Sequence, residues 1–327
     1  MAGRKVRKPK VSDDHPSASL WRRWLQPLES VRETSSPPLD AGSLEMAIEP
    51  AISGTEAKFR KAMLETMKTA LSSARQTLAS EFETQNDGAV YVGRHAWIMD
   101  LLIGFIVTQA GRRFGLDGKK HRMAVVAVGG YGRGELAPFS DVDILFLMSE
   151  TQAPAIEKTI EFSLYLLWDL GLKVGHATRT VRETVDTARA DQTVLTGLLE
   201  MRKISGHQQL YGQLEGAVVD IIAKMKASDF VEQKLTERDQ RHARLGATRY
   251  VVEPNIKEGK GGLRDLHTLF WITNFAYRTN TVLDLVDQIV LRDSEARRFA
   301  AAQRFLWTVR CHLHLFAGRA EERLDFE

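Results

Sequence analysis

Residues 128–147, which read VGGYGRGELAPFSDVDILFL, decide the fold of this chain. A short apolar run rich in valine, residues 123–128, leads into them and predicts a buried strand. A glycine-rich loop over residues 129–140 follows, and residues 142–148 then predict a second strand. The stretch therefore predicts two strands joined by a glycine-rich loop, with an acidic residue directly before the second strand.

Asp141 and Asp143 are the chemically distinctive pair in this stretch. Side chains two residues apart on a strand point to the same face, so the two carboxylates should lie close together and repel each other. A strand otherwise made of Val, Ile, Leu and Phe does not bury two charges without a counter-ion. Oxygen ligands favour Mg²⁺ or Mn²⁺ over zinc, so we predict that Asp141 and Asp143 are metal ligands and catalytic residues.

The glycine loop fits some phosphate-binding chemistries and excludes others. A P-loop needs Lys followed by Ser or Thr after its last glycine, and neither follows here. Residues 132–137 formally fit a dinucleotide-binding fingerprint, but Pro138 follows at once and the next predicted element is a strand instead of a helix. Glycines that let the backbone approach a phosphate, beside metal-binding carboxylates, are typical of phosphoryl or nucleotidyl transfer.

These residues resemble the nucleotidyltransferase superfamily typified by DNA polymerase beta. The longer string GGYGRGELAPFSDVDILFL is similar to the family of protein-PII uridylyltransferase/uridylyl-removing enzymes. The resemblance implies that Gly129 and Gly130 lie at a nucleotide triphosphate and that Asp141 and Asp143 hold two Mg²⁺ ions. It also implies the fold, a short mixed sheet flanked by helices and followed by an all-helical domain, which makes the chain α+β.

We also predict roles for three other polar residues of this region. We expect Arg133 and Ser140 to contact phosphate, and Glu135 to form an ion pair with Arg133. The superfamily often has a third carboxylate on a later strand, but the predicted strand at 172–178 has no acid. Asp191 fits a helix N-cap better, so the third carboxylate has no assignment.

A second motif follows about 110 residues later, where residues 253–272 read EPNIKEGKGGLRDLHTLFWI. A basic glycine-rich loop that opens an amphipathic helix suits an anionic ligand. The string also resembles the helical region of the same family. Lys257, Lys260 and Arg264 are therefore the predicted ligands of nucleotide phosphate or of an acidic partner surface.

The pattern along the chain predicts three parts. We expect residues 1–55, basic at the start and without a sustained period, to form a flexible tail. Residues 56–185 should form the nucleotidyltransferase domain with a helical lead-in, and residues 186–327 a helical uridylyltransferase-associated domain. Members of the family continue with a hydrolase domain of the His-Asp type and two glutamine-sensing domains, and we expect this chain to stop before them.

Composition excludes several other classes of protein. Among 327 residues, 45 Lys and Arg balance 42 Asp and Glu, which leaves a net charge of +3 and argues against a nucleic-acid partner. The single cysteine, Cys311, excludes an internal disulfide and fits a reducing cytoplasm. The apolar stretch 96–110 is too short to span a bilayer and contains Asp100, so we expect no membrane partner.

The resemblance implies transfer of UMP from UTP to a tyrosine of the nitrogen-regulatory PII protein, with release of pyrophosphate and with Mg²⁺ or Mn²⁺ as cofactor. Two alternatives remain open. The chain could adenylylate a protein on the same fold, or it could be an inactive fragment that binds nucleotide or PII. The choice of uracil rests on the resemblance alone.

Overall fold

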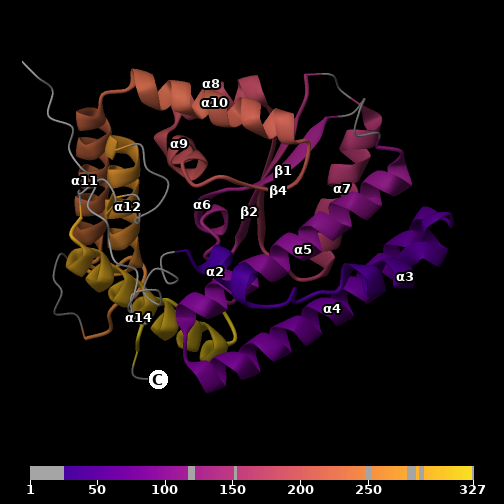
Figure 1. Ribbon diagram of the computed structural model, residues 1–327, viewed down its shortest axis with the longest axis horizontal. Helices are drawn as coiled ribbons and strands as arrows, with labels where there is room; N and C mark the ends of the chain where they lie inside the picture. The colour runs from indigo at the N-terminus through magenta and orange to yellow at the C-terminus, as the bar shows by residue number, and fades with distance from the viewer. Residues whose placement is uncertain are drawn as a thin grey trace, which may run out of the picture.

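The computed structural model describes residues 26–116, 122–150, 153–246, 252–277, 285–286 and 291–325. Within these ranges a four-stranded sheet lies at the centre of the molecule, surrounded by helices (Figure 1). Its strands are β1 (Met123–Ala127), β2 (Val142–Met148), β3 (Val174–Thr180) and β4 (Arg202–Gly206).

The sheet is mixed, with the strand order β3-β2-β1-β4. Strand β1 pairs antiparallel with both β2 and β4, whereas β2 pairs parallel with β3. A short mixed sheet flanked by helices is the fold that the family resemblance implied, and the α+β prediction is confirmed.

Helices cover both faces of this sheet because its two central strands, β1 and β2, are apolar on both sides. Helices α5 (Gly88–Phe114) and α7 (Pro154–Asp169) lie on one face. Helices α8 (Val181–Ala190) and α10 (Gln208–Lys224) lie on the other, as Figure 1 shows. Alternate residues of β2 divide between two hydrophobic clusters: Ile144 and Phe146 join the first, and Leu145 and Leu147 the second.

Helix α5 is the central core helix. It is long and apolar enough to cross a membrane by length and composition, but 78% of its apolar segment is buried inside the protein. It packs against α7, α14 (Asp293–Ala317) and α4 (Glu56–Gln85). We therefore interpret its hydrophobicity as that of a core element.

The structure differs from the sequence-based prediction at the N-terminal side. Residues expected to belong to a flexible tail form α2 (Pro27–Thr34) and α3 (Ala41–Ile52), and both pack against α5. Leu28 and Ile48 are fully buried. Each helix is too short to show a sustained apolar period, which is why no helical pattern is visible in this part of the sequence. Residues 1–25 of the expected tail lie outside the described residues.

The region expected to be all-helical also contributes β4, the edge strand beside β1. Its sequence, RKISG, starts with two charges and has a single large apolar residue, so no strand alternation is visible. Helices α11 (Ala227–Arg244), α12 (Leu263–Tyr277) and α14 gather at one end of the sheet (Figure 1). Phe230 of α11 stacks on Phe275 of α12, with ring centroids 4.1 Å apart.

Helix α14 joins this helical region to the core. Thr308 accepts a hydrogen bond from the backbone N–H of Gly88 at 2.9 Å, at the start of α5. Cys311, one turn further along α14, is fully buried in the main hydrophobic cluster. Burial raises the pKa of its thiol far above the ordinary value, so the thiol stays protonated.

A buried histidine on α5 should make the stability of the fold depend on pH. His95 Nδ1 lies 3.1 Å from the Leu136 carbonyl oxygen and donates to it. Burial, reinforced by the nearby Arg75 guanidinium, lowers the pKa of His95 to about 4 from an ordinary value of about 6.5. Between these values the unfolded chain binds more protons than the folded one, so the free energy of unfolding should fall as the pH drops from 6.5 to 4.

The expected contribution of His95 to this loss is about 3 kcal/mol, measured as the difference between the unmodified chain and His95→Gln in urea unfolding at a series of pH values. His95→Gln should remove that part of the pH dependence. His176→Gln, which changes an exposed histidine of β3, should leave it in place. An unchanged pH slope in His95→Gln would show that another group carries the effect.

Candidate functional site

A cavity of about 550 Å³ opens between the sheet and the helical region. The glycine loop and the two aspartates line one side of it, and α11, α12 and α14 line the other. The cavity brings together most of the residues predicted from the sequence, namely Gly129, Gly130, Arg133, Ser140, Asp141, Asp143, Lys257 and Arg264. Two motifs about 110 residues apart in the sequence therefore share one site.

The two aspartates lie at the start of β2, where Asp143 is the second residue of the strand and Asp141 immediately precedes it. Both are exposed to the cavity. Burial and the neighbouring charge of Asp141 raise the pKa of Asp143, against the opposing effect of Lys257. The pair thus has an unfavourable concentration of negative charge that a cation would relieve.

The neighbouring strand leaves room for Asp143. In the parallel register Asp143 lies opposite Gly175 of β3. A Cβ atom on Gly175 would come within 2.3 Å of Oδ1 of Asp143, so a larger residue there would displace the carboxylate. His176 belongs to the other face, where its ring lies against Trp168 with centroids 5.8 Å apart.

Within the described part of the chain, no third carboxylate joins the pair. Among the residues that the structure describes, no group of three or more His, Cys, Asp or Glu side chains could hold a metal ion. Asp191 caps α9 (Gln192–Leu198) by accepting from the backbone N–H of Thr193 at 2.7 Å, as predicted. The donor set is therefore two mutually repelling carboxylates open to a cavity, which fits a divalent cation that prefers oxygen ligands.

The glycine loop folds into a single helical turn, α6 (Gly129–Gly132). Gly129 has φ of +59°, a left-handed conformation that favours glycine. Its Cα lies near the aspartates, since a Cβ there would be 3.8 Å from Oδ2 of Asp143. Backbone N–H groups at the start of a helical turn have no acceptor within it, so this corner offers donors beside the two carboxylates.

A buried carboxylate holds the glycine loop from behind. Asp100 of α5 accepts from the Tyr131 hydroxyl at 2.8 Å, from Arg202 of β4 at 2.6 and 3.0 Å, and from Arg32 of α2 at 2.5 Å. Arg202 also donates to the backbone carbonyls of Tyr131 and Gly132, at 3.1 and 3.3 Å. We call these side chains the Asp100 cluster: Asp100, Arg32, Tyr131 and Arg202.

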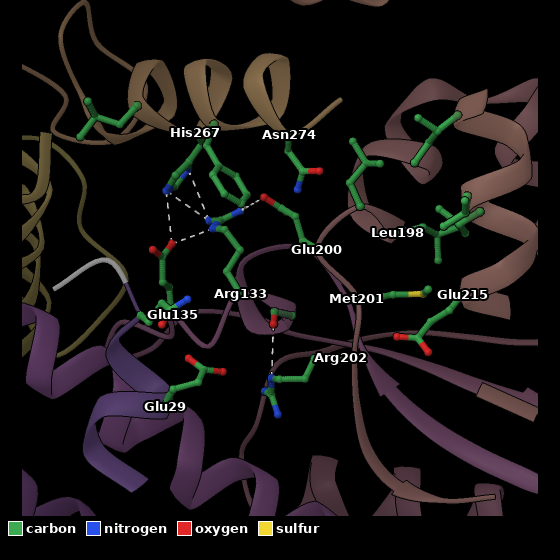
Figure 2. Close-up of a pocket in the computed structure, with 18 of the residues that line it drawn as sticks. Glu29, Arg133, Glu135, Leu198, Glu200, Met201, Arg202, Glu215, His267 and Asn274 are labelled. Atoms are coloured by element: carbon green, nitrogen blue, oxygen red, sulfur yellow. Dashed lines mark hydrogen bonds and ion pairs between the residues drawn. The ribbon is translucent and has the colours of Figure 1, made fainter. Parts of the chain in front are cut away.

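A second charged network holds the same loop from the side of the helices. Figure 2 shows Arg133 between Glu135, Glu200 and His267 of α12. Its guanidinium donates to Glu135 at 2.7 Å and to Glu200 at 2.5 Å, and lies 3.2 Å from Nε2 of His267. Gln303 of α14 adds a hydrogen bond to Glu135 at 2.5 Å. The predicted ion pair between Arg133 and Glu135 is confirmed.

Burial alone would raise the pKa of Glu135, but the Arg133 guanidinium and a hydrogen bond from His267 hold it at about 2. Burial and the same guanidinium lower the pKa of His267 to about 3. Arg133 therefore has two carboxylate partners and stands in the wall between the site and a second cavity of about 460 Å³ (Figure 2). This placement does not favour the predicted role of Arg133 as a free phosphate ligand.

The second motif reaches the cavity in part. Lys257 lines it and lies 3.9 Å from Glu322, while Arg264 lines it and donates to Glu258 at 3.1 Å. Lys260 is exposed and lines a separate depression beside α11, so the structure does not bring it into the site. The loop turns between these residues, which points their side chains in different directions.

Several residues of the site were missed by the sequence analysis. Arg241 of α11 pairs with Asp265 at 2.5 Å, and Arg310 of α14 pairs with Glu322 at 2.5 Å. Arg241, Arg310 and Glu322 line the cavity, whereas Asp265 does not. An arginine in a long helix carries no local signal of function, because only the tertiary packing decides whether it faces a cavity or solvent.

Comparison with known proteins agrees with this geometry. Residues 116–194, which contain the glycine loop and both aspartates, match the model of the nucleotidyltransferase domain. Residues 229–327 match the model described as GlnD PII-uridylyltransferase. The chain is 45% identical over 300 residues to the bifunctional uridylyltransferase/uridylyl-removing enzyme of Rhodospirillum rubrum.

The chain belongs to the PII-uridylyltransferase family.

The match to this relative covers 88% of the chain but 32% of the relative, so the chain spans about a third of that protein's length. The two matched models correspond to the two sides of the cavity. The nucleotidyltransferase domain supplies the glycine loop and the aspartates, and the PII-uridylyltransferase region supplies the basic side chains opposite.

Loss of the carboxylate in the Asp100 cluster should destabilise the fold. Asp100→Asn would leave Arg202, which is largely buried, without its charge partner, at an expected cost of about 3 kcal/mol in the free energy of unfolding. Asp186→Asn, which removes an exposed ion pair on α8, should cost less than about 1 kcal/mol. Urea unfolding of both variants measures the difference, and equal costs would contradict the assigned role of the cluster.

Proposed function

We propose that this chain transfers UMP from UTP to a tyrosine hydroxyl of a PII signalling protein and releases pyrophosphate. The observation that carries the proposal is the shared cavity. A glycine loop, a pair of carboxylates and a basic wall face one another across it. The family of the chain supports uracil and PII as the base and the protein substrate, since the matched relative is named for uridylyl transfer.

Each group that lines the cavity would have a separate role in such a transfer. The backbone of the Gly129–Gly132 turn would receive the triphosphate, and Ser140 would contribute a hydroxyl beside it. Lys257 and Arg264 on the opposite wall would offset the negative charge of the phosphates. The tyrosine oxygen forms a bond to the α-phosphorus, the bond from that phosphorus to the bridging oxygen breaks, and the tyrosine proton is lost to solvent.

Asp141 and Asp143 would hold the divalent cations, Mg²⁺ or Mn²⁺. When bound there, such ions make a hydroxyl more acidic and stabilise a pyrophosphate leaving group. Asp143 would be kept in place by the gap at Gly175 and by the register of β2 against β3. Arg133 would act through the loop that it anchors, while Lys260 would stay available to a partner surface outside the cavity.

We propose that the chain acts in the cytoplasm, that PII is its partner, and that neither nucleic acid nor a membrane is a partner. We also propose that the nucleotidyltransferase domain spans residues 56–185 and that the helical domain spans residues 186–327. Strand β4 modifies this division, because residues 202–206 complete the sheet of the first domain.

Transfer of label tests the proposal directly. Purified chain with Mg²⁺ and UTP labelled at the α-phosphate should label purified PII. The double variant Asp141→Asn, Asp143→Asn should reduce labelling by at least about 1000-fold, since the site would lose its cation-binding charge. A parallel reaction with labelled ATP separates uridylylation from adenylylation. Label from ATP alone would reassign the base, and no label from folded chain would contradict transfer.

The gap opposite Asp143 gives a second, finer prediction. Gly175→Ala should lower the rate of transfer by about 10- to 100-fold by displacing the carboxylate, with the chain still folded. Gly212→Ala on α10 is the matched control, because a Cβ there has open space. It should leave the rate unchanged. The same labelling assay and a thermal unfolding curve for each variant give the result, and equal rates would refute the geometric role of Gly175.

A further inference from the structure

Three side chains that can carry positive charge converge on one carboxylate inside the candidate site. Arg310 donates to Glu322 from Nε at 2.8 Å and from Nη2 at 2.5 Å. Lys257 Nζ lies 3.9 Å from the same carboxylate, and His314 Nε2 lies 3.5 Å from it. Glu322 therefore pairs with basic groups of the cavity that also contains the two aspartates.

Arg310 is well placed to reach a ligand of the glycine loop. It extends from α14 into the cavity, with only 8% of its side chain exposed. Its guanidinium packs over the ring of Trp307, 5.1 Å from the centroid, which limits its freedom. Nη2 lies 3.5 Å from Oγ of Ser140, the residue directly before Asp141.

Glu322, by contrast, belongs to a short segment that pairs with residues 254–256 through its backbone. The backbone N–H of Ile256 donates to the Glu322 carbonyl at 2.8 Å, and the N–H of Leu324 donates to Pro254 at 3.0 Å. The side chains of Arg323 and Leu324 are exposed. The carboxylate can therefore turn away from Arg310 without disturbing a packed core.

The fork of a guanidinium fits the oxygens of a phosphate as well as those of a carboxylate. A buried guanidinium also needs a partner at all times, because an unpaired charge in such a place is costly. Glu322 meets this need with a single negative charge. A triphosphate brings more charge to the same groups and can compete for them.

We propose that Arg310 is a phosphate-binding residue of the nucleotide site and that Glu322 is its resting partner, which the phosphate oxygens replace when the nucleotide binds. This inference rests on the proposed function and adds to it a residue from the helical region. It also gives the nucleotide a direct contact with α14, so that both parts of the chain hold the same ligand.

Calorimetric titration with Mg·UTP, without PII, tests the exchange of partners. Arg310→Gln should weaken binding by about 10- to 100-fold, and Arg310→Lys by less. Glu322→Gln should strengthen binding by about 3- to 10-fold because the guanidinium no longer has a competing charge. In the double variant most of the gain from Glu322→Gln should be lost, because Arg310 is the closest of the basic groups that pair with Glu322. The affinities of these variants for inorganic tripolyphosphate should follow the same order as their affinities for Mg·UTP.

Matched controls separate local contacts from net charge. Arg298→Gln changes an exposed arginine of the same helix, and Asp325→Asn removes an exposed acid three residues from Glu322. Both should bind Mg·UTP as the unmodified chain does. A thermal unfolding curve for each variant shows that it is folded at the temperature of titration.

The outcomes are distinct. Unchanged affinity in folded Arg310→Gln, or weaker binding in Glu322→Gln, would overturn the inference and would leave the proposed function intact if PII is still labelled. Tight binding with the expected order of variants but no labelling of PII would support the inference and refute the transfer. Failure of the unmodified chain to bind either Mg·UTP or tripolyphosphate would overturn both.

Discussion

The buried carboxylate of Asp100 is the interaction on which the arrangement of the site depends. It lies on the central helix α5, and its partners come from α2, from the glycine loop and from β4. A carboxylate in an apolar core is tolerated only when other groups compensate its charge, so these three elements have to meet at that point. Because one partner belongs to the glycine loop and another donates to the loop carbonyls, charge compensation fixes where the loop lies relative to the sheet.

The helical region completes this restraint from the opposite direction. Arg133 links the loop to Glu200, and His267 and Gln303 extend the network to α12 and α14. The loop is thus held between two buried charged clusters, one inside the nucleotidyltransferase fold and the other at its border with the helices. This explains why residues far apart in sequence line one cavity, and why neither half of the chain forms it alone.

The sequence predicted what local chemistry determines. The apolar run before the loop and the aspartates two residues apart were enough for two strands and the acidic corner of the site, and the family resemblance of the same stretch implied the mixed fold. It did not predict contacts that depend on tertiary packing. Arg133 looked like a phosphate ligand, but Glu135 of the same loop and Glu200, 67 residues further along the chain, both pair with it. Lys260 is close to Lys257 in sequence, yet a turn of the loop separates them. Arg310 and Glu322 gave no signal, since ordinary helix and loop residues become part of a site only when the chain folds back.

The buried thiol of Cys311 has a practical consequence. It is the only cysteine of the chain, it lies where α14 packs into the main core, and it stays protonated there. A thiol reagent can reach it only when α14 separates from α5, so the rate of its modification measures how often that interface opens. The native sequence thus contains its own single-site reporter for the dynamics of the helix that carries Arg310, and no engineered label is needed to observe whether a nucleotide slows that opening.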